Sequence, residues 1–154
     1  MKSTFDIRQV TWQKAQHSLR LIRHQVFVCE LRVPLKDEFD DDDKTAWHLL
    51  AFNQEQQPIA TGRLCHTGEI GRIAVLINYR DKGIGSAIAQ QLFALAQDKQ
   101  LEHVFMNPEL DCLSQFSSCN PHPVGPVFME AGVPHQQLTC DCKTSALPDL
   151  AYLH

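Results

Sequence analysis

One stretch decides the fold of this chain: Arg80-Asp81-Lys82-Gly83-Ile84-Gly85-Ser86. It follows an apolar run, Ile70 to Ile77, and precedes a pattern in which apolar residues recur every three or four positions, as in an amphipathic helix. Two glycines one residue apart permit a sharp turn and let successive backbone N–H groups converge on an anion. A helix that starts there adds the positive end of its dipole. The stretch therefore predicts a strand, a phosphate-binding loop and a helix.

Two common glycine-loop motifs do not match this stretch. A Walker loop places its lysine directly after the last glycine, whereas Lys82 precedes Gly83. A Rossmann loop needs a third glycine three residues after Gly85, where this chain has Ile88. Nucleotide binding of either kind is disfavoured.

Strands and helices alternate along the rest of the chain. Three strands are predicted in succession at 45–53, 59–66 and 69–77. The third of them is mostly apolar, which indicates burial on both faces, as at the centre of a mixed sheet with helices on each side. The class is α/β, more closely α+β. The predicted order is a strand at 4–10, helical structure at 13–30, a polar loop at 34–44, strands at 45–53, 59–66 and 69–77, a helix from 84, a strand at 103–106, a short helix at 110–116, a loop at 117–123, and strands at 124–129 and 135–142.

Length and composition exclude several classes of protein. A chain of 154 residues is most simply one domain, 1–154, with 143–154 as a loosely held tail. No segment reaches the roughly 20 apolar residues of a membrane helix, and the first residues lack the apolar core of a secretory signal, so we expect a cytoplasmic protein without membrane contact. The formal net charge of −4 argues against nucleic-acid binding.

The cysteines do not indicate a metal site or a disulfide framework. None of the six forms a Cys-x-x-Cys pair, so a zinc site is not expected and we predict no metal. Reduced thiols are typical of a chain of this length without an export signal.

The pattern Arg-x-x-Gly-x-Gly between a buried strand and a helix resembles the acetyl-CoA pyrophosphate loop of the GNAT (Gcn5-related N-acetyltransferase) superfamily. Gly71-Arg72-Ile73-Ala74-Val75 is similar to the central strand of that family. Three further stretches resemble its branch of small bacterial proteins related to ElaA and YjcF: Val26-Phe27-Val28-x-Glu30 with Val33-Pro34, Glu38-x-Asp40-x-x-Asp43-x-x-Ala46-x-His48-Leu49, and Phe128-x-Glu130-Ala131-Gly132-Val133-Pro134-His135.

The resemblance implies a fold and a cosubstrate. The fold is a central mixed, mostly antiparallel sheet of six to seven strands flanked by helices, in which the glycine-loop strand and the next strand splay apart and hold acyl-CoA. The cosubstrate is acetyl-CoA, and members are often homodimers. The implied contacts are backbone contacts, with the pantetheine from Ala74 and Val75 and with the pyrophosphate from Arg80, Lys82, Gly83, Ile84, Gly85 and Ser86. Asn107 stands where the family often places an asparagine beside the pantetheine.

One departure from the family concerns the leaving group. Many relatives place a tyrosine about nine residues after the asparagine to protonate the departing thiolate, whereas this chain has Phe116. A thiol has a pKa of about 8.5 and leaves with modest help, and general acid assistance is typically worth roughly 10²–10⁴-fold. One interpretation of phenylalanine at this position is a slower enzyme, in which Ser117, Ser118 or water protonates the thiolate in place of the tyrosine. The other is a protein that only binds acyl-CoA.

The amine acceptor needs a base. A lysine-like amine has a pKa of about 10.4 and is almost wholly protonated at pH 7. Glu38, Asp40 and His48 are the candidates, and the acidic stretch 37–43 would attract a cationic acceptor. The alternatives are a solvated loop for the aspartates and a hydrogen-bonded core histidine for His48. For His135, we expect a bond to backbone near the end of the sheet.

Two functions follow. The first is an acetyl-CoA-dependent N-acetyltransferase acting on a small-molecule or peptide amine by direct attack in a ternary complex. The second is a non-catalytic acyl-CoA-binding regulator that acts through a protein partner. The acidic segment favours the first function and the absent tyrosine favours the second.

Overall fold

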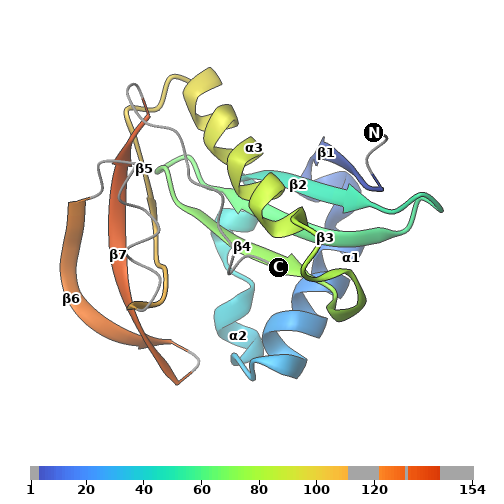
Figure 1. Cartoon of the computed structure of the whole chain (residues 1–154), viewed down its shortest axis with the longest axis horizontal. Coiled ribbons are helices and arrows are strands. Elements are labelled where there is room, and N and C mark those ends of the chain that lie inside the picture. The colour runs from blue at the N-terminus through green and yellow to red at the C-terminus, as the bar shows by residue number, and fades with distance from the viewer. Residues whose placement is uncertain (1–3, 111–121, 131, 143–154) are drawn as a thin grey trace.

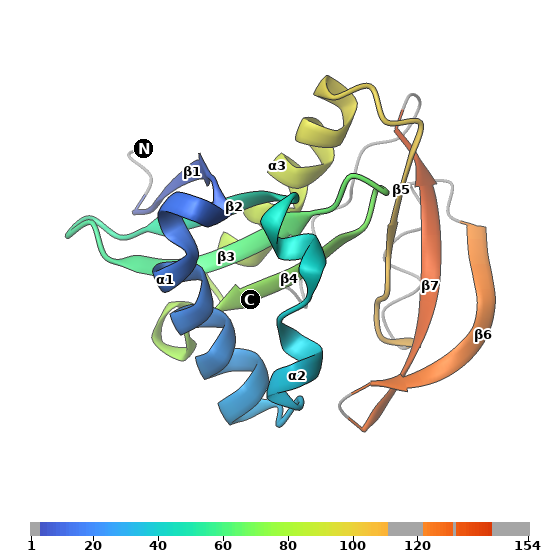
Figure 2. The same cartoon turned by 180° about the vertical axis from the view of Figure 1, so that it is seen from behind.

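The computed structural model describes residues 4–110, 122–130 and 132–142, excepting the side chains at 36 and 37. It has seven strands, which confirms the predicted α+β class (Figures 1 and 2). The strands are β1 (Asp6–Val10), β2 (Trp47–Phe52), β3 (Pro58–Leu64), β4 (Ile70–Val75), β5 (His103–Met106), β6 (His122–Glu130) and β7 (Val133–Asp141). The helices are α1 (Trp12–Arg23), continued by a π-helical segment (His24–Glu30), then α2 (Leu35–Glu38) and α3 (Ile84–Asp98), with 3₁₀ turns at Asp41–Lys44 and Ile77–Tyr79.

The first four strands form an antiparallel sheet in the order β1-β2-β3-β4. Its two faces are covered by different helices, α3 on one and α1 on the other (Figures 1 and 2). Neighbouring residues of β2 show the alternation of a strand buried on both sides, because Leu49 packs with the α3 residues and Leu50 with the α1 residues. At Gly62, a Cβ atom would lie 2.4 Å from Ile88 Cγ2, so glycine is what lets α3 approach the sheet.

The last three strands form a second antiparallel sheet in the order β5-β7-β6. The two sheets meet at one parallel bridge, between Glu69 and Phe105, where the Phe105 N–H donates to the Gly68 carbonyl at 3.0 Å. Gly68 has φ +102°, and a Cβ there would lie 2.6 Å from the His103 carbonyl oxygen. Beyond this bridge β4 and β5 share no other pair within the described ranges. The predicted mixed sheet thus exists as two antiparallel sheets that part between β4 and β5.

Two local predictions differ from the structure. The segment 34–44, predicted as a loop, contains α2 and a 3₁₀ turn, since Asp40 and Asp43 cap the turn through each other's backbone N–H groups. His122, predicted in a loop, begins β6. The predicted short helix to Phe116, most of the loop that follows it and the tail 143–154 lie outside the described residues. No helix that the structure describes is long and apolar enough to cross a membrane.

Candidate active site

A cleft of about 350 Å³ lies where β4 and β5 part. One wall comes from β4 with Glu69, and the other comes from the residues after β5 and from the β6–β7 hairpin. Ala89 of α3, together with Phe27 and Leu31 at the end of the first helical region, completes the lining. The ionisable lining residues are Glu38, Glu69, Arg72, Glu109, Glu130 and His135.

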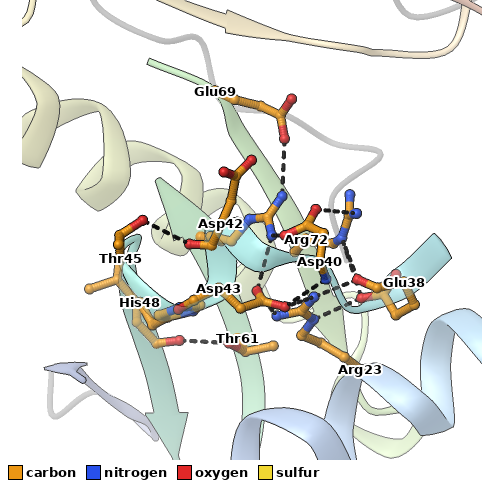
Figure 3. Close-up of polar contacts among 12 residues, drawn as sticks. Arg23, Glu38, Asp40, Asp42, Asp43, Thr45, His48, Thr61, Glu69 and Arg72 are labelled. Carbon is orange, nitrogen blue, oxygen red and sulfur yellow. Dashed lines mark hydrogen bonds and ion pairs between the residues drawn. The ribbon is translucent and has the colours of Figure 1, made fainter. Parts of the chain in front are cut away.

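A buried arginine joins α1 to the acidic segment. Arg23 is 1% exposed and donates from Nε to Glu38 Oε1 at 2.7 Å, from Nη1 to Asp43 Oδ1 at 2.6 Å and from Nη2 to the Glu38 carbonyl at 2.7 Å (Figure 3). Buried charges persist in proteins only when they are paired in this way. The contacts therefore fix the segment 38–43 against the sheet.

Two further arginines extend this network to the cleft. Arg63 donates to Asp40 Oδ1 at 2.7 Å, to Asp43 Oδ1 at 3.0 Å and to Glu69 Oε1 at 3.2 Å. Arg72, in the cleft wall, lies 3.4 Å from Glu38 Oε1 and 3.4 Å from Asp40 Oδ2 (Figure 3). Arg72 has φ +51°, at the irregularity where β3 and β4 change register. The network thus reaches from the core to Arg72 and Glu69 at the cleft.

Burial and charge shift the ionisation of this cluster in opposite directions. Burial raises the pKa of Glu38, and the nearby Arg23 offsets the rise only in part. Burial would raise the pKa of Asp43 too, but the hydrogen bond and charge of Arg23, with help from Arg63, outweigh it and lower that pKa. Burial lowers the pKa of His48. At neutral pH these directions favour an ionised Asp43 and a neutral His48.

The three predicted base candidates separate in the structure. His48 is 1% exposed, packs against Trp12, and donates from Nε2 to the Asp43 carbonyl at 2.8 Å. Asp40 lines a different cavity of about 410 Å³, together with Trp12 and Phe39. Only Glu38 among the three lines the cleft. The contacts of His48 favour the core-histidine alternative, and the choice of a base stays a prediction.

The glycine loop has the geometry of a helix start left open to a ligand. Gly83 immediately precedes α3 with φ +78°, and no heavy atom lies within 4 Å of a Cβ built there. No side chain caps the first turn of α3. Ala74, Val75, Ile84, Gly85 and Ser86 are buried, whereas Lys82 is exposed. Ala74, Val75, Ile84 and Gly85 have only backbone polar groups to offer a pyrophosphate or a pantetheine, which is the kind of contact that the resemblance implies, and Ser86 has a hydroxyl besides its backbone groups.

The side chain of Arg80 makes contacts that the sequence did not predict, and its expected backbone contact with the pyrophosphate stays a prediction. Its Nη2 donates to both Glu30 carboxylate oxygens, at 2.9 and 2.7 Å, and its Nε donates to the Val75 carbonyl at 2.9 Å. Arg80 therefore joins the glycine loop to the end of the π-helical segment. The sequence signal for Glu30 was its place in the Val26-Phe27-Val28-x-Glu30 motif, but nothing in the spacing connects it with Arg80.

Asn107 and His135 meet at the other wall of the cleft. The Asn107 carbonyl accepts a hydrogen bond from His135 Nδ1 at 2.9 Å, and both residues line the cleft. The predicted bond from His135 to backbone is confirmed. Sequence reasoning missed the cleft glutamates Glu69, Glu109 and Glu130, because they belong to three separate segments that only the tertiary structure brings together. Phe116, Ser117 and Ser118, the positions tied to the missing tyrosine, lie outside the described residues.

Comparisons with known proteins agree with this geometry. The model of the acetyltransferase (GNAT) family matches residues 6–112. The uncharacterized protein YyaT of Bacillus subtilis (strain 168) is 30% identical over 140 residues, covering 87% of this chain and 94% of YyaT. The uncharacterized N-acetyltransferase YjcF of the same organism is 27% identical over 124 residues, 78% of this chain and 88% of YjcF. The crystal structure of Escherichia coli ElaA has the same fold, with a TM-score of 0.72 at 21% identity over 88% of this chain and 99% of ElaA. The chain belongs to the GNAT family of acyl-CoA-dependent N-acetyltransferases.

Proposed function

We propose that this protein transfers an acetyl group from acetyl-CoA to the primary amine of a cationic acceptor, by direct attack in a ternary complex. The observation that carries the proposal is the cleft between β4 and β5, which is lined by four glutamates, one arginine and one histidine. The glycine loop and the open start of α3 supply the matching site for a pyrophosphate.

The charge balance of the cleft favours a cation. Arg72 is matched by Glu38 and Asp40, and Glu69 is matched by Arg63. Glu109 and the half-exposed Glu130 then add negative charge at the cleft without an arginine or lysine partner among the described ion pairs. Carboxylates in such a cleft raise the local concentration of a cationic substrate. We assign the attraction first expected of the acidic stretch 37–43 to these glutamates, because Asp40 and Asp41 line the separate cavity.

The cosubstrate supplies an activated acyl carbonyl. We place its pyrophosphate at the backbone N–H groups of residues 82–86, and its pantetheine along β4 at Ala74 and Val75, with Asn107 opposite. A strand edge freed from pairing has N–H groups that can polarise the thioester carbonyl, where negative charge develops during attack. The parting of β4 and β5 frees such an edge.

Glu38 takes a positioning role in this scheme. Its carboxylate is shared between Arg23 and Arg72, so it holds the Arg72 guanidinium at the wall of the cleft. Because both guanidinium groups contact Glu38 Oε1, at 2.7 Å and 3.4 Å, we assign this carboxylate to positioning and not to proton transfer. We propose no catalytic role for Asp40 or His48. The alternative function, an acyl-CoA sensor, depends on Phe116, and the described residues carry no observation in its favour.

Calorimetric titration with acetyl-CoA and CoA, followed by thiol release with polyamines, amino acid amides and peptides, tests the proposal. We expect binding and turnover with polycationic amines and a kcat/KM that falls as salt is added. Lys82→Ala should weaken CoA binding by about tenfold, as removal of a charged phosphate contact does. Lys99→Ala, at the other end of α3, is the matched control and should bind CoA like the wild type. Binding without turnover for every amine would instead support the sensor.

A further inference from the structure

His135 is held rigidly at the wall of the cleft. The register of the β6–β7 hairpin places Phe128 directly opposite His135, and the two rings stack with centroids 5.9 Å apart at an interplanar angle of 24°. On its other side, Nδ1 bonds the Asn107 carbonyl at 2.9 Å. The side chain is 13% exposed and contributes to the lining of the cleft. Stacking and the hydrogen bond therefore fix both the position and the rotation of the ring.

The Asn107 contact also determines the tautomer. A carbonyl oxygen can only accept, so Nδ1 carries the hydrogen and Nε2 of the neutral ring carries a lone pair. No contact to Nε2 occurs among the residues that the structure describes. His48 makes the opposite choice, because its Nε2 is the donor, and it does not line the cleft.

Carboxylates surround the ring on its own side of the cleft. Glu130 Oε2 lies 3.7 Å from Nδ1, and Glu109 is the bridge partner of His135. Across the cleft are Glu38, Glu69 and Arg72, of which Arg72 is already paired with Glu38 and Asp40. An imidazolium at this position would thus face carboxylates on its own side and a neutralised guanidinium opposite.

We propose that His135 is the general base of the reaction and that its Nε2 removes a proton from the acceptor ammonium. The proposal rests on the acetyltransferase function above. The freed amine nitrogen attacks the thioester carbonyl carbon, the N–C bond forms and the C–S bond breaks. The nitrogen loses a second proton as the amide forms, and the departing thiolate takes up one proton. His135 returns its own proton to solvent, so each turnover yields one amide, one CoA thiol and one released proton.

His135→Asn separates catalysis from structure. The asparagine amide can still donate to the Asn107 carbonyl, but it has no basic nitrogen. The matched control is His66→Gln. His66 donates to a backbone carbonyl too, but from Nε2, to Thr45 at 2.7 Å, and the longer glutamine amide reaches that position. Its ring stacks on Trp47 at 3.9 Å, and His66 does not line the cleft.

For the best amine of the panel, we expect kcat/KM of His135→Asn to fall by roughly 10²–10³-fold and CoA affinity to stay within about twofold. We expect kcat/KM of the wild type to fall on acidification and this fall to disappear in the variant. His66→Gln should match the wild type in all three measurements. If His135→Asn keeps kcat/KM within about threefold and retains the acid limb, His135 is not the base.

A second measurement does not depend on turnover. Long-range ¹⁵N–¹H correlation spectra of histidine-labelled protein report which ring nitrogen carries the hydrogen. We expect the Nδ1–H form for His135 in the free protein, and an Nε2–H form would overturn the proposal. If wild-type protein binds acetyl-CoA but acetylates no amine, the proposed function fails together with this role. An active His135→Asn variant would refute only the role of His135.

Discussion

Arg23→Met is the sharpest test of the buried network. Methionine fills a similar volume but leaves the carboxylates of Glu38 and Asp43 buried without their nearest cation. Breaking a buried ion pair by removing one partner costs about 3–5 kcal/mol. Arg63 stays 3.0 Å from Asp43, and Arg72 stays 3.4 Å from Glu38, so we expect the lower end, about 3 kcal/mol. For a domain of this size that equals a fall in Tm of about 6–12 °C.

Urea unfolding at pH 7, followed by circular dichroism, measures the loss. Arg20→Met is the matched control on the same helix, because Arg20 is exposed and lies 5.0 and 5.2 Å from the ring centroids of Trp12 and Phe39. It should cost about 1 kcal/mol or less. Equal losses in the two variants would refute the reasoning, as would a loss below about 1 kcal/mol in Arg23→Met.

The pH dependence supplies a second check with a definite sign. The pKa of Asp43 is lowered in the folded protein, so its contribution to stability is present at neutral pH and is lost as the pH falls through that pKa. Glu38 has the opposite effect on stability. Its pKa is raised in the folded protein, so its contribution to the free energy of unfolding is largest at low pH. Without Arg23 both carboxyls protonate more readily. The stability gap between wild type and variant should therefore narrow on acidification, and a widening gap would contradict this account.

Three further predictions concern single contacts. Gly68→Ala should lower stability by about 1–3 kcal/mol in thermal unfolding, because a Cβ would lie 2.6 Å from a backbone oxygen at φ +102°; an unchanged Tm would show that the junction of the sheets adapts freely. Glu30→Gln should weaken CoA binding about three- to tenfold in calorimetry by loosening Arg80, and unchanged affinity would leave the pair with only a structural role. Peptide mapping after brief alkylation at pH 7.5 should find Cys29 modified and Cys65 intact, because Cys29 is exposed and burial raises the pKa of Cys65 to about 11; rapid labelling of Cys65 would contradict its burial.

Elements that depend on local chemistry could be predicted from the order of the residues. The glycine pair before an amphipathic repeat predicted the helix that begins at Ile84, and the apolar runs predicted the strands of the first sheet to within a few residues. Such patterns predict helices and strands because backbone conformation depends on neighbouring residues, and apolar residues repeat every 2.0 positions in a strand and every 3.6 in a helix. The backbone bond of His135 was also foreseen. The single domain, the cytoplasmic location and the homodimer stay predictions.

The partners of the charged residues depend on tertiary packing and could not be predicted in this way. The sequence left open a solvated loop for the aspartate run. Asp41 and Asp42 are exposed, whereas Asp43 lies buried between Arg23 and Arg63, which come from α1 and β3. The Arg80 side chain is paired with Glu30, fifty positions earlier in the chain, while the backbone contact of Arg80 with a pyrophosphate stays a prediction. Two oppositely charged side chains meet because whole helices and strands pack together. The number of residues between them in the sequence does not predict how far apart they lie in the structure. The cleft and the tautomer of His135 also depend on tertiary structure. The cleft lies where the two sheets part, and the tautomer follows from the Asn107 carbonyl that the fold places beside the ring.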